Sequence, residues 1–135
     1  MKYVDFKLPD KLGQPQSFEY FISQILTDKN GFKIVFHNNK DDKYDIVFDF
    51  GGAVMDYRVS DEGRRLDHHV DEELTGGLVT EAIDSEYLKK LDEEAEGILL
   101  AINPDLKHYI AGDQDYCVDI ISRAEPKVYK VKSKK

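Results

Sequence analysis

GFKIVFHNNKDDKYDIVFDFGGAVMDYRV, residues 31 to 59, carries the strongest structural signal in the chain. Apolar and polar side chains alternate in three consecutive segments, the period that places the apolar set on one face of a half-buried strand. The segments are residues 32–36, 44–50 and 53–59. Gly51 and Gly52 permit the positive φ angles of a tight hairpin. The stretch predicts an antiparallel β-meander with one solvated face.

Strand patterns also occur on both sides of this stretch. Val4, Phe6 and Leu8 alternate with charged residues, which predicts a short strand. FEYFISQIL (18–26) is apolar at odd and even positions; its aromatic content and the following DKNG turn favour a strand over a short helix. KHYIA and DYCVDII flank GDQD and predict a hairpin. A four-residue loop would match Ala111 with Tyr116, apolar against apolar. The terminal EPKVYKVKSKK is expected to form an edge strand protected by its lysines.

One main helix is expected over about 85–102. Ser85 suits the N-cap position, and Asn103-Pro104 suits the end. The apolar residues that recur at helical spacing are Leu88, Leu91, Ala95, Ile98, Leu99 and Ile102. Gly97 would cost up to about 1 kcal/mol inside a helix, so a break there is the alternative. The fold expected is α+β, an antiparallel β-meander sheet with this helix and a C-terminal β-hairpin, in a single domain spanning 1–135.

Composition and charge limit the classes of function. The single cysteine, Cys117, excludes an intrachain disulfide and favours a reducing compartment. We see no signal peptide, and no apolar run approaches the ~20 residues that span a bilayer, so we expect a cytoplasmic protein. The net charge is −8, and the middle of the chain is acidic. Acidity argues against nucleic-acid binding and would speed encounter with a basic partner, although it also simply aids solubility.

RRLDHHVDEE (64–73) is the clearest candidate for a metal or acid–base site. Adjacent histidines point about 100° apart on a helix and to opposite faces of a strand, so His68 and His69 cannot share one ion on regular backbone. His69 with Glu72 or Glu73 supplies only two ligands. Leu66, Val70 and Leu74 fit a short amphipathic helix instead. We therefore predict no metal site and no cofactor.

Other signs of catalysis are weak. In the expected hairpin register His108 faces Asp119, which fits a cross-strand ion pair or part of a catalytic dyad. Cys117 lies among apolar residues and is expected to pack as a small hydrophobe. The motifs GxSxG, GxxxxGK, GxGxxG and HExxH do not occur. A non-enzymatic protein is expected; a small hydrolase or metal-dependent enzyme using histidines and carboxylates is the alternative.

The carboxyl half, SEYLKKL followed by an acidic helix and HYIAGDQDYCVDIISRAEPKV, resembles small bacterial immunity proteins of polymorphic or contact-dependent toxin systems. The matching positions, within residues 85–128, are Ser85, Glu86, Tyr87, His108, Tyr109, Asp119, Ile120, Glu125 and Pro126. VDII stands where an IDV-type strand is expected. The resemblance implies an inhibitor that binds a cognate toxin, often a nuclease. The members of this family share no common active site.

The expected binding surface is acidic, because nuclease toxins tend to be basic and an acidic protein can cover such a surface. The candidate partner-binding residues are Asp67, Asp71, Glu72, Glu73, Asp92, Glu93, Glu94 and Glu96. They cluster on the expected exposed faces of two helical stretches. A housekeeping interaction domain with no toxin partner is a further alternative.

Overall fold

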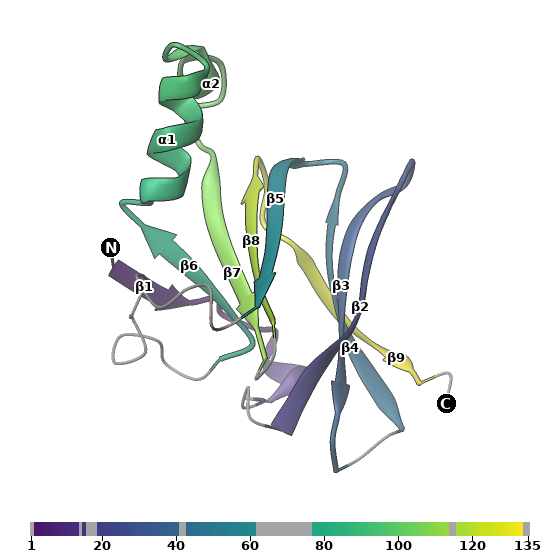
Figure 1. Ribbon diagram of the computed structural model, residues 1–135. Helices are drawn as coiled ribbons and strands as arrows, with labels where there is room; N and C mark the ends of the chain where they lie inside the picture. The colour runs from purple at the N-terminus through teal and green to yellow at the C-terminus, as the bar shows by residue number, and fades with distance from the viewer. Residues whose placement is uncertain are drawn as a thin grey trace.

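The computed structural model describes residues 2–13, 15, 19–40, 43–61, 77–113 and 116–133. Two antiparallel β-sheets face each other, and two short helices stand at one end of the first (Figure 1). The strands are β1 (Lys2–Asp5), β2 (Tyr20–Asp28), β3 (Gly31–Asn38), β4 (Tyr44–Gly51), β5 (Val54–Asp61), β6 (Val79–Ile83), β7 (Lys107–Gly112), β8 (Tyr116–Ser122) and β9 (Lys127–Lys132). The helices are η1 (Asp10–Leu12), α1 (Glu86–Glu94) and α2 (Ile98–Ile102).

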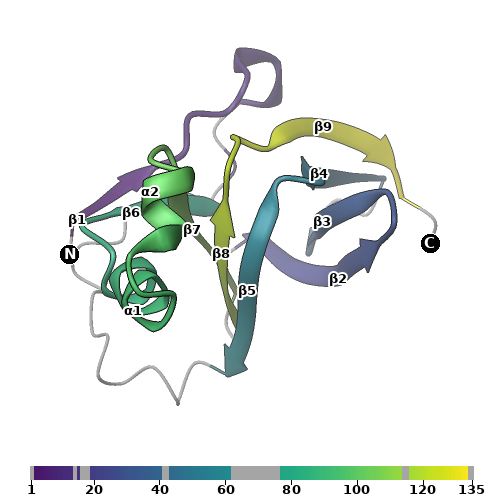
Figure 2. The same ribbon diagram turned by 90° about the horizontal axis from the view of Figure 1, so that it is seen from above.

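Each sheet combines strands that are distant in the sequence. Sheet A has the order β1-β6-β7-β8-β5, and sheet B has the order β2-β3-β4-β9. The chain passes from sheet B to sheet A between β4 and β5, and returns between β8 and β9 (Figure 2). β9 is an edge strand, as its lysines predict.

The predicted meander is wrong at its third strand. β3 and β4 pair as expected, with Ile34 opposite Phe48. β5, however, leaves this sheet and pairs with β8. The edge of β4 that the meander would give to β5 pairs with β9 instead. Asp49 of β4 lies opposite Lys127 and accepts a hydrogen bond of 3.4 Å from the Tyr129 hydroxyl. Complementary side chains at a distant position therefore replace the local hairpin partner.

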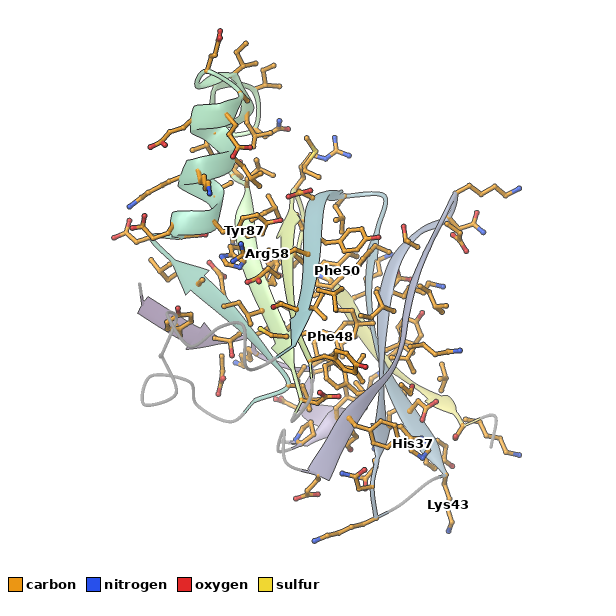
Figure 3. The ribbon with its side chains drawn as sticks, in the orientation of Figure 1. His37, Lys43, Phe48, Phe50, Arg58 and Tyr87 are labelled. Atoms are coloured by element: carbon orange, nitrogen blue, oxygen red, sulfur yellow. The ribbon has the colours of Figure 1, made fainter. Side chains whose placement is uncertain are left out.

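The hydrophobic core lies between the two sheets. Its buried residues are Phe32, Ile34, Phe36, Ile46, Phe48, Phe50, Leu78, Val79, Tyr109, Ala111, Val118 and Ile120. Edge-to-face and tilted ring contacts join them, such as Phe36 to Phe48 at 5.5 Å and Phe50 to Tyr109 at 5.6 Å between centroids. Such pairs contribute roughly 0.5–1.5 kcal/mol beyond their buried area. Figure 3 shows Phe48 and Phe50 between the sheets.

The α+β prediction with one main helix is wrong, because the described structure is mainly β. Ser85 caps α1 as predicted, accepting the Leu88 N–H at 3.0 Å. The helical segment then breaks after Glu94, where Glu96 and Gly97 have φ angles of 57° and 83°. Neither α1 nor α2 contains a buried residue. Helical spacing indicated where a helix forms, but the second sheet, not the helix, covers the core face of sheet A.

The C-terminal hairpin forms, with a register two residues away from the prediction. Tyr109 lies opposite Ile120 and Ala111 opposite Val118. The predicted opposition of Ala111 and Tyr116 is therefore wrong: Gly112 lies opposite Cys117, and the Asp113 N–H donates to the Tyr116 carbonyl at 3.0 Å. Because the register is shifted by two residues, each side chain still lies on the face of the sheet that was predicted for it. β6 was not predicted, and no described helix is long and apolar enough to cross a membrane.

Candidate functional site

The predicted site residues of 64–73, namely Asp67, His68, His69, Asp71, Glu72 and Glu73, lie outside the described residues. Within the described residues, no group of three or more His, Cys, Asp or Glu side chains could hold a metal ion. Two surface hollows are lined without histidine: one of about 590 Å³ beside Phe6 and Pro126, the other of about 280 Å³ beside Phe32 and Tyr57.

A chain of polar side chains lies on the face of sheet A that points away from sheet B. We call this set the polar network; it consists of Asp56, Arg58, Ser85, Tyr87, His108 and Asp119. Figure 3 shows Arg58 and Tyr87 together below α1. The network joins β5, β7 and β8 to the start of the helix.

His108 is the centre of the network. Its Nε2 lies 2.6 Å from Asp119 Oδ1, and its Nδ1 lies 2.6 Å from Ser85 Oγ. Because Ile110 stands opposite Asp119, the His108–Asp119 contact is diagonal between β7 and β8. The predicted cross-strand pair is thus confirmed as a contact, in a different register. A neutral imidazole satisfies all partners: Nε2–H donates to Asp119, and Nδ1 accepts from the Ser85 hydroxyl.

Asp119 is fully buried, and a cation compensates its charge. Arg58 Nε donates to Asp119 Oδ2 at 2.9 Å, while the Arg58 side chain is 44% exposed. The two strands set this contact, since Arg58 of β5 lies directly opposite Asp119 of β8. A buried carboxylate with partners on both oxygens avoids the large penalty of an unpaired charge.

Tyr87 links the first turn of α1 to β5. Its hydroxyl donates to Asp56 Oδ2, and the Arg58 guanidinium lies 4.3 Å from the centroid of its ring. Burial raises the pKa of the Tyr87 phenol, and the hydrogen bond and negative charge of Asp56 raise it further. Tyr87 therefore stays neutral and holds the cation–π contact.

Ser85, His108 and Asp119 are the three residue types of a hydrolytic triad, but their setting does not suit catalysis. Ser85 and His108 are 5% and 1% exposed. The Ser85 hydroxyl oxygen already accepts the Leu88 N–H as the cap of α1. A nucleophile must reach its substrate, whereas the Ser85 hydroxyl is buried and already makes two hydrogen bonds, with the Leu88 N–H and with His108 Nδ1. The polar network instead anchors α1 to sheet A.

The remaining predicted binding residues lie on the helical pair, α1 and α2. Glu93, Glu94 and Glu96 are exposed, as predicted. Asp92 is half-buried, and its Oδ1 accepts the Leu100 N–H at 2.8 Å. Asp92 therefore joins the two helices by satisfying a free N–H in the first turn of α2.

Helical spacing places Ile98 and Ile102 among the apolar residues of one main helix, but both lie on the separate short helix α2. They are 56% and 71% exposed. The residues are four apart on α2, so they lie on the same face of that helix. The break at Gly97, which has a φ angle of 83°, separates α2 from α1, so the apolar residues do not form one continuous helix face.

Comparisons of the chain with protein-family models, with curated proteins and with solved structures give no match.

Proposed function

We propose that the protein is a non-enzymatic binding protein of the immunity type, and that it neutralises a basic toxin in the cytoplasm through the helical pair. One observation carries the proposal: exposed Ile98 and Ile102 lie side by side on helices that bury none of their residues. Figures 1 and 2 show these helices projecting at one end of sheet A, on the side away from sheet B. Exposed apolar groups with a polar rim are typical of protein-binding surfaces.

Charge supports a basic partner. Residues 84–105 contain seven carboxylates and two lysines, a net charge of −5. Lys89 lies within 4.0 Å of Asp84 and Glu86, so it partly compensates the start of α1. Among the described residues no cation forms an ion pair with Glu93, Glu94 or Glu96. The end of the helical pair that contains these three glutamates is also the end that carries Ile98 and Ile102.

The partner experiment is co-expression with the product of the neighbouring gene. We expect the two proteins to co-purify and the growth defect caused by that product to be relieved. Glu93→Lys/Glu94→Lys should slow association, and added salt should do the same for the wild type, because steering is screened over about 8 Å at physiological salt. The matched control is Asp10→Lys/Asp28→Lys, the same charge change at exposed sites outside α1 and α2.

The apolar contact has its own test. Ile102→Asp should speed dissociation, since the exposed isoleucine would lose its buried contact in the complex. Folding should be unchanged, because Ile102 is 71% exposed. An enzymatic function would replace this proposal if the purified protein turned over a substrate and Ser85→Ala or His108→Ala abolished the turnover.

A further inference from the structure

β5 is an open edge of sheet A. It pairs with β8 on one side, and no described strand pairs with it on the other. Met55, Tyr57 and Val59 are 43%, 41% and 46% exposed. A long edge strand with apolar side chains is a template for pairing with another strand.

The other three edges are protected by different means. β1 has only four residues, and β9 carries Lys127, Lys130 and Lys132. β2 has a bulge after Ile22, and the Ile22 N–H is already occupied by the Asp113 carboxylate at 2.8 Å. Lysines, short length and bulges are common protections of sheet edges. β5 contains neither lysine nor proline, and its bulge, between Val54 and Asp56, lies at one end.

The sequence of β5, VMDYRVSD, is self-complementary about Tyr57. In an antiparallel pair of two copies centred there, Tyr57 faces Tyr57 and Asp56 faces Arg58 of the second copy. Met55 lies at the bulge, where the strand alternation is interrupted. A twofold axis perpendicular to the sheet requires this kind of reciprocal pairing. The pairing keeps apolar residues on the face of Ile120 and charged residues on the face of Asp119.

Charge also selects the register. If the twofold axis passed through Arg58 instead of Tyr57, the two Arg58 side chains would lie opposite each other. If it passed through Asp56, the two Asp56 carboxylates would lie opposite each other. Like charges directly opposite are destabilising. A register shift of one residue is excluded as well, because it would oppose side chains from different faces. Only the Tyr57-centred register pairs opposite charges.

Both charged residues keep bonding capacity for a second copy. Arg58 uses Nε for Asp119, and its side chain is 44% exposed, which leaves terminal N–H groups for another carboxylate. Asp56 accepts from Tyr87 through Oδ2, and Oδ1 can accept a further bond. The polar network therefore holds both groups in place on the outer face of sheet A through Asp119 and Tyr87.

We propose that the protein forms a symmetric homodimer by antiparallel pairing of β5 with β5 of a second copy. The two five-stranded sheets then become one continuous sheet. The interface borders the first turn of α1 through Tyr87, whereas Glu93, Glu94 and Ile98 lie at the other end of that helix, so each subunit retains its surface for the basic partner.

Position 57 gives a register-specific test, because its side chain faces the same position of the second copy. Light scattering after size exclusion should give a dimer for the wild type and a monomer for Tyr57→Lys and Tyr57→Glu separately. An equimolar mixture of these two variants should restore the dimer, since lysine then faces glutamate. The matched control is Val4→Lys on β1, an exposed apolar residue of the opposite edge, which should remain dimeric.

Circular dichroism on each variant separates loss of pairing from loss of folding, because Tyr57 also contacts the Phe32 ring at 4.8 Å between centroids. A folded monomeric wild type at the highest concentration reached would overturn the proposal. So would a wild-type dimer that both single variants retain, or variants that fold but fail to associate when mixed.

Discussion

Two His–Asp pairs bridge neighbouring strands on the outer faces of the two sheets, and their surroundings differ. His37 of β3 and Asp45 of β4 lie directly opposite each other, 2.6 Å apart, with side chains 6% and 14% exposed. His108 and Asp119 have the same separation but are 1% and 0% exposed. The first pair joins two strands of one local hairpin. The second also binds Ser85 and Arg58, so it joins a helix and a third strand to the sheet.

The number of groups that bond a carboxylate, not the contact distance, decides how much stability is lost when that carboxylate is removed. Water can reach Asp45, so the loss of that carboxylate leaves His37 near solvent. Removal of Asp119 leaves a guanidinium and an enclosed imidazole without their partner. The cost of breaking a buried pair comes mainly from the group that stays behind.

Asp119→Ala should therefore have the largest effect. We expect the free energy of unfolding to fall by roughly 3 kcal/mol, because the buried His108 N–H loses its acceptor and half-exposed Arg58 loses a charge-assisted hydrogen bond. Urea denaturation followed by circular dichroism measures this change. Exposed Asp105→Ala is the matched control and should stay within about 0.5 kcal/mol of the wild type. A loss no larger than the control's would show that the polar network does not hold sheet A and α1 together.

Ser85→Ala should have the next largest effect, about 2 kcal/mol. The substitution removes the cap of α1, worth about 1 kcal/mol, and leaves His108 Nδ1 without its hydroxyl. Ser23→Ala is the control, because Ser23 is exposed and makes one hydrogen bond to the Val35 carbonyl. Amide hydrogen exchange should show faster exchange at Leu88 in the Ser85 variant alone. Unchanged exchange there would contradict the cap.

Asp45→Ala should cost less, about 1 kcal/mol, the net value of one hydrogen bond at a site that water can reach. The same denaturation experiment applies, and His37→Ala/Asp45→Ala tests the coupling. The double variant should be little worse than the single one. A loss equal to that of Asp119→Ala would remove the contrast between the two pairs.

The smallest expected effect is a loss of stability at alkaline pH. Burial, followed by the hydrogen bond to Asp56, raises the pKa of Tyr87 above its usual value near 10. The folded state therefore holds this proton more tightly than the unfolded state, and that stabilisation is lost as pH rises from about 10 through the raised pKa. Absorbance titration of the wild type and of Tyr87→Phe should differ by one phenol that ionises above pH 10. Asp56→Asn should lower the pKa of Tyr87, because it removes the negative charge beside the phenol.

Local periodicity predicted most strands correctly. The alternation around Phe32–Phe36 and Tyr44–Phe50, the hairpin of β7 and β8, the lysine-bearing edge strand and the Ser85 cap all follow from neighbours in the sequence. The strand with which each strand pairs does not follow from neighbours in the sequence. The period-2 pattern of β5 is the same whether it pairs with β4 or β8, and the pairing depends on contacts such as Arg58 with Asp119, 61 residues apart.

The polar network shows the same limit for the site. The sequence predicted that His108 and Asp119 pair, because they belong to one hairpin. It gave no sign that Ser85 or Arg58 would join them, since these residues come from separate elements. Exposure of Ile98 and Ile102 was also unpredictable, because helical spacing specifies a face of the helix but not what covers that face.

β9 fills the edge of β4, and the Tyr129 hydroxyl that bonds Asp49 comes from a residue 80 positions later in the chain. During synthesis, β2, β3 and β4 therefore leave the ribosome long before the strand that completes their sheet, and β5 is made well before β8. At about 5–20 residues per second, this leaves an open β4 edge for several seconds. Nascent chains should thus depend on chaperones until β9 emerges, and a chain that stops before β9 should aggregate through β4.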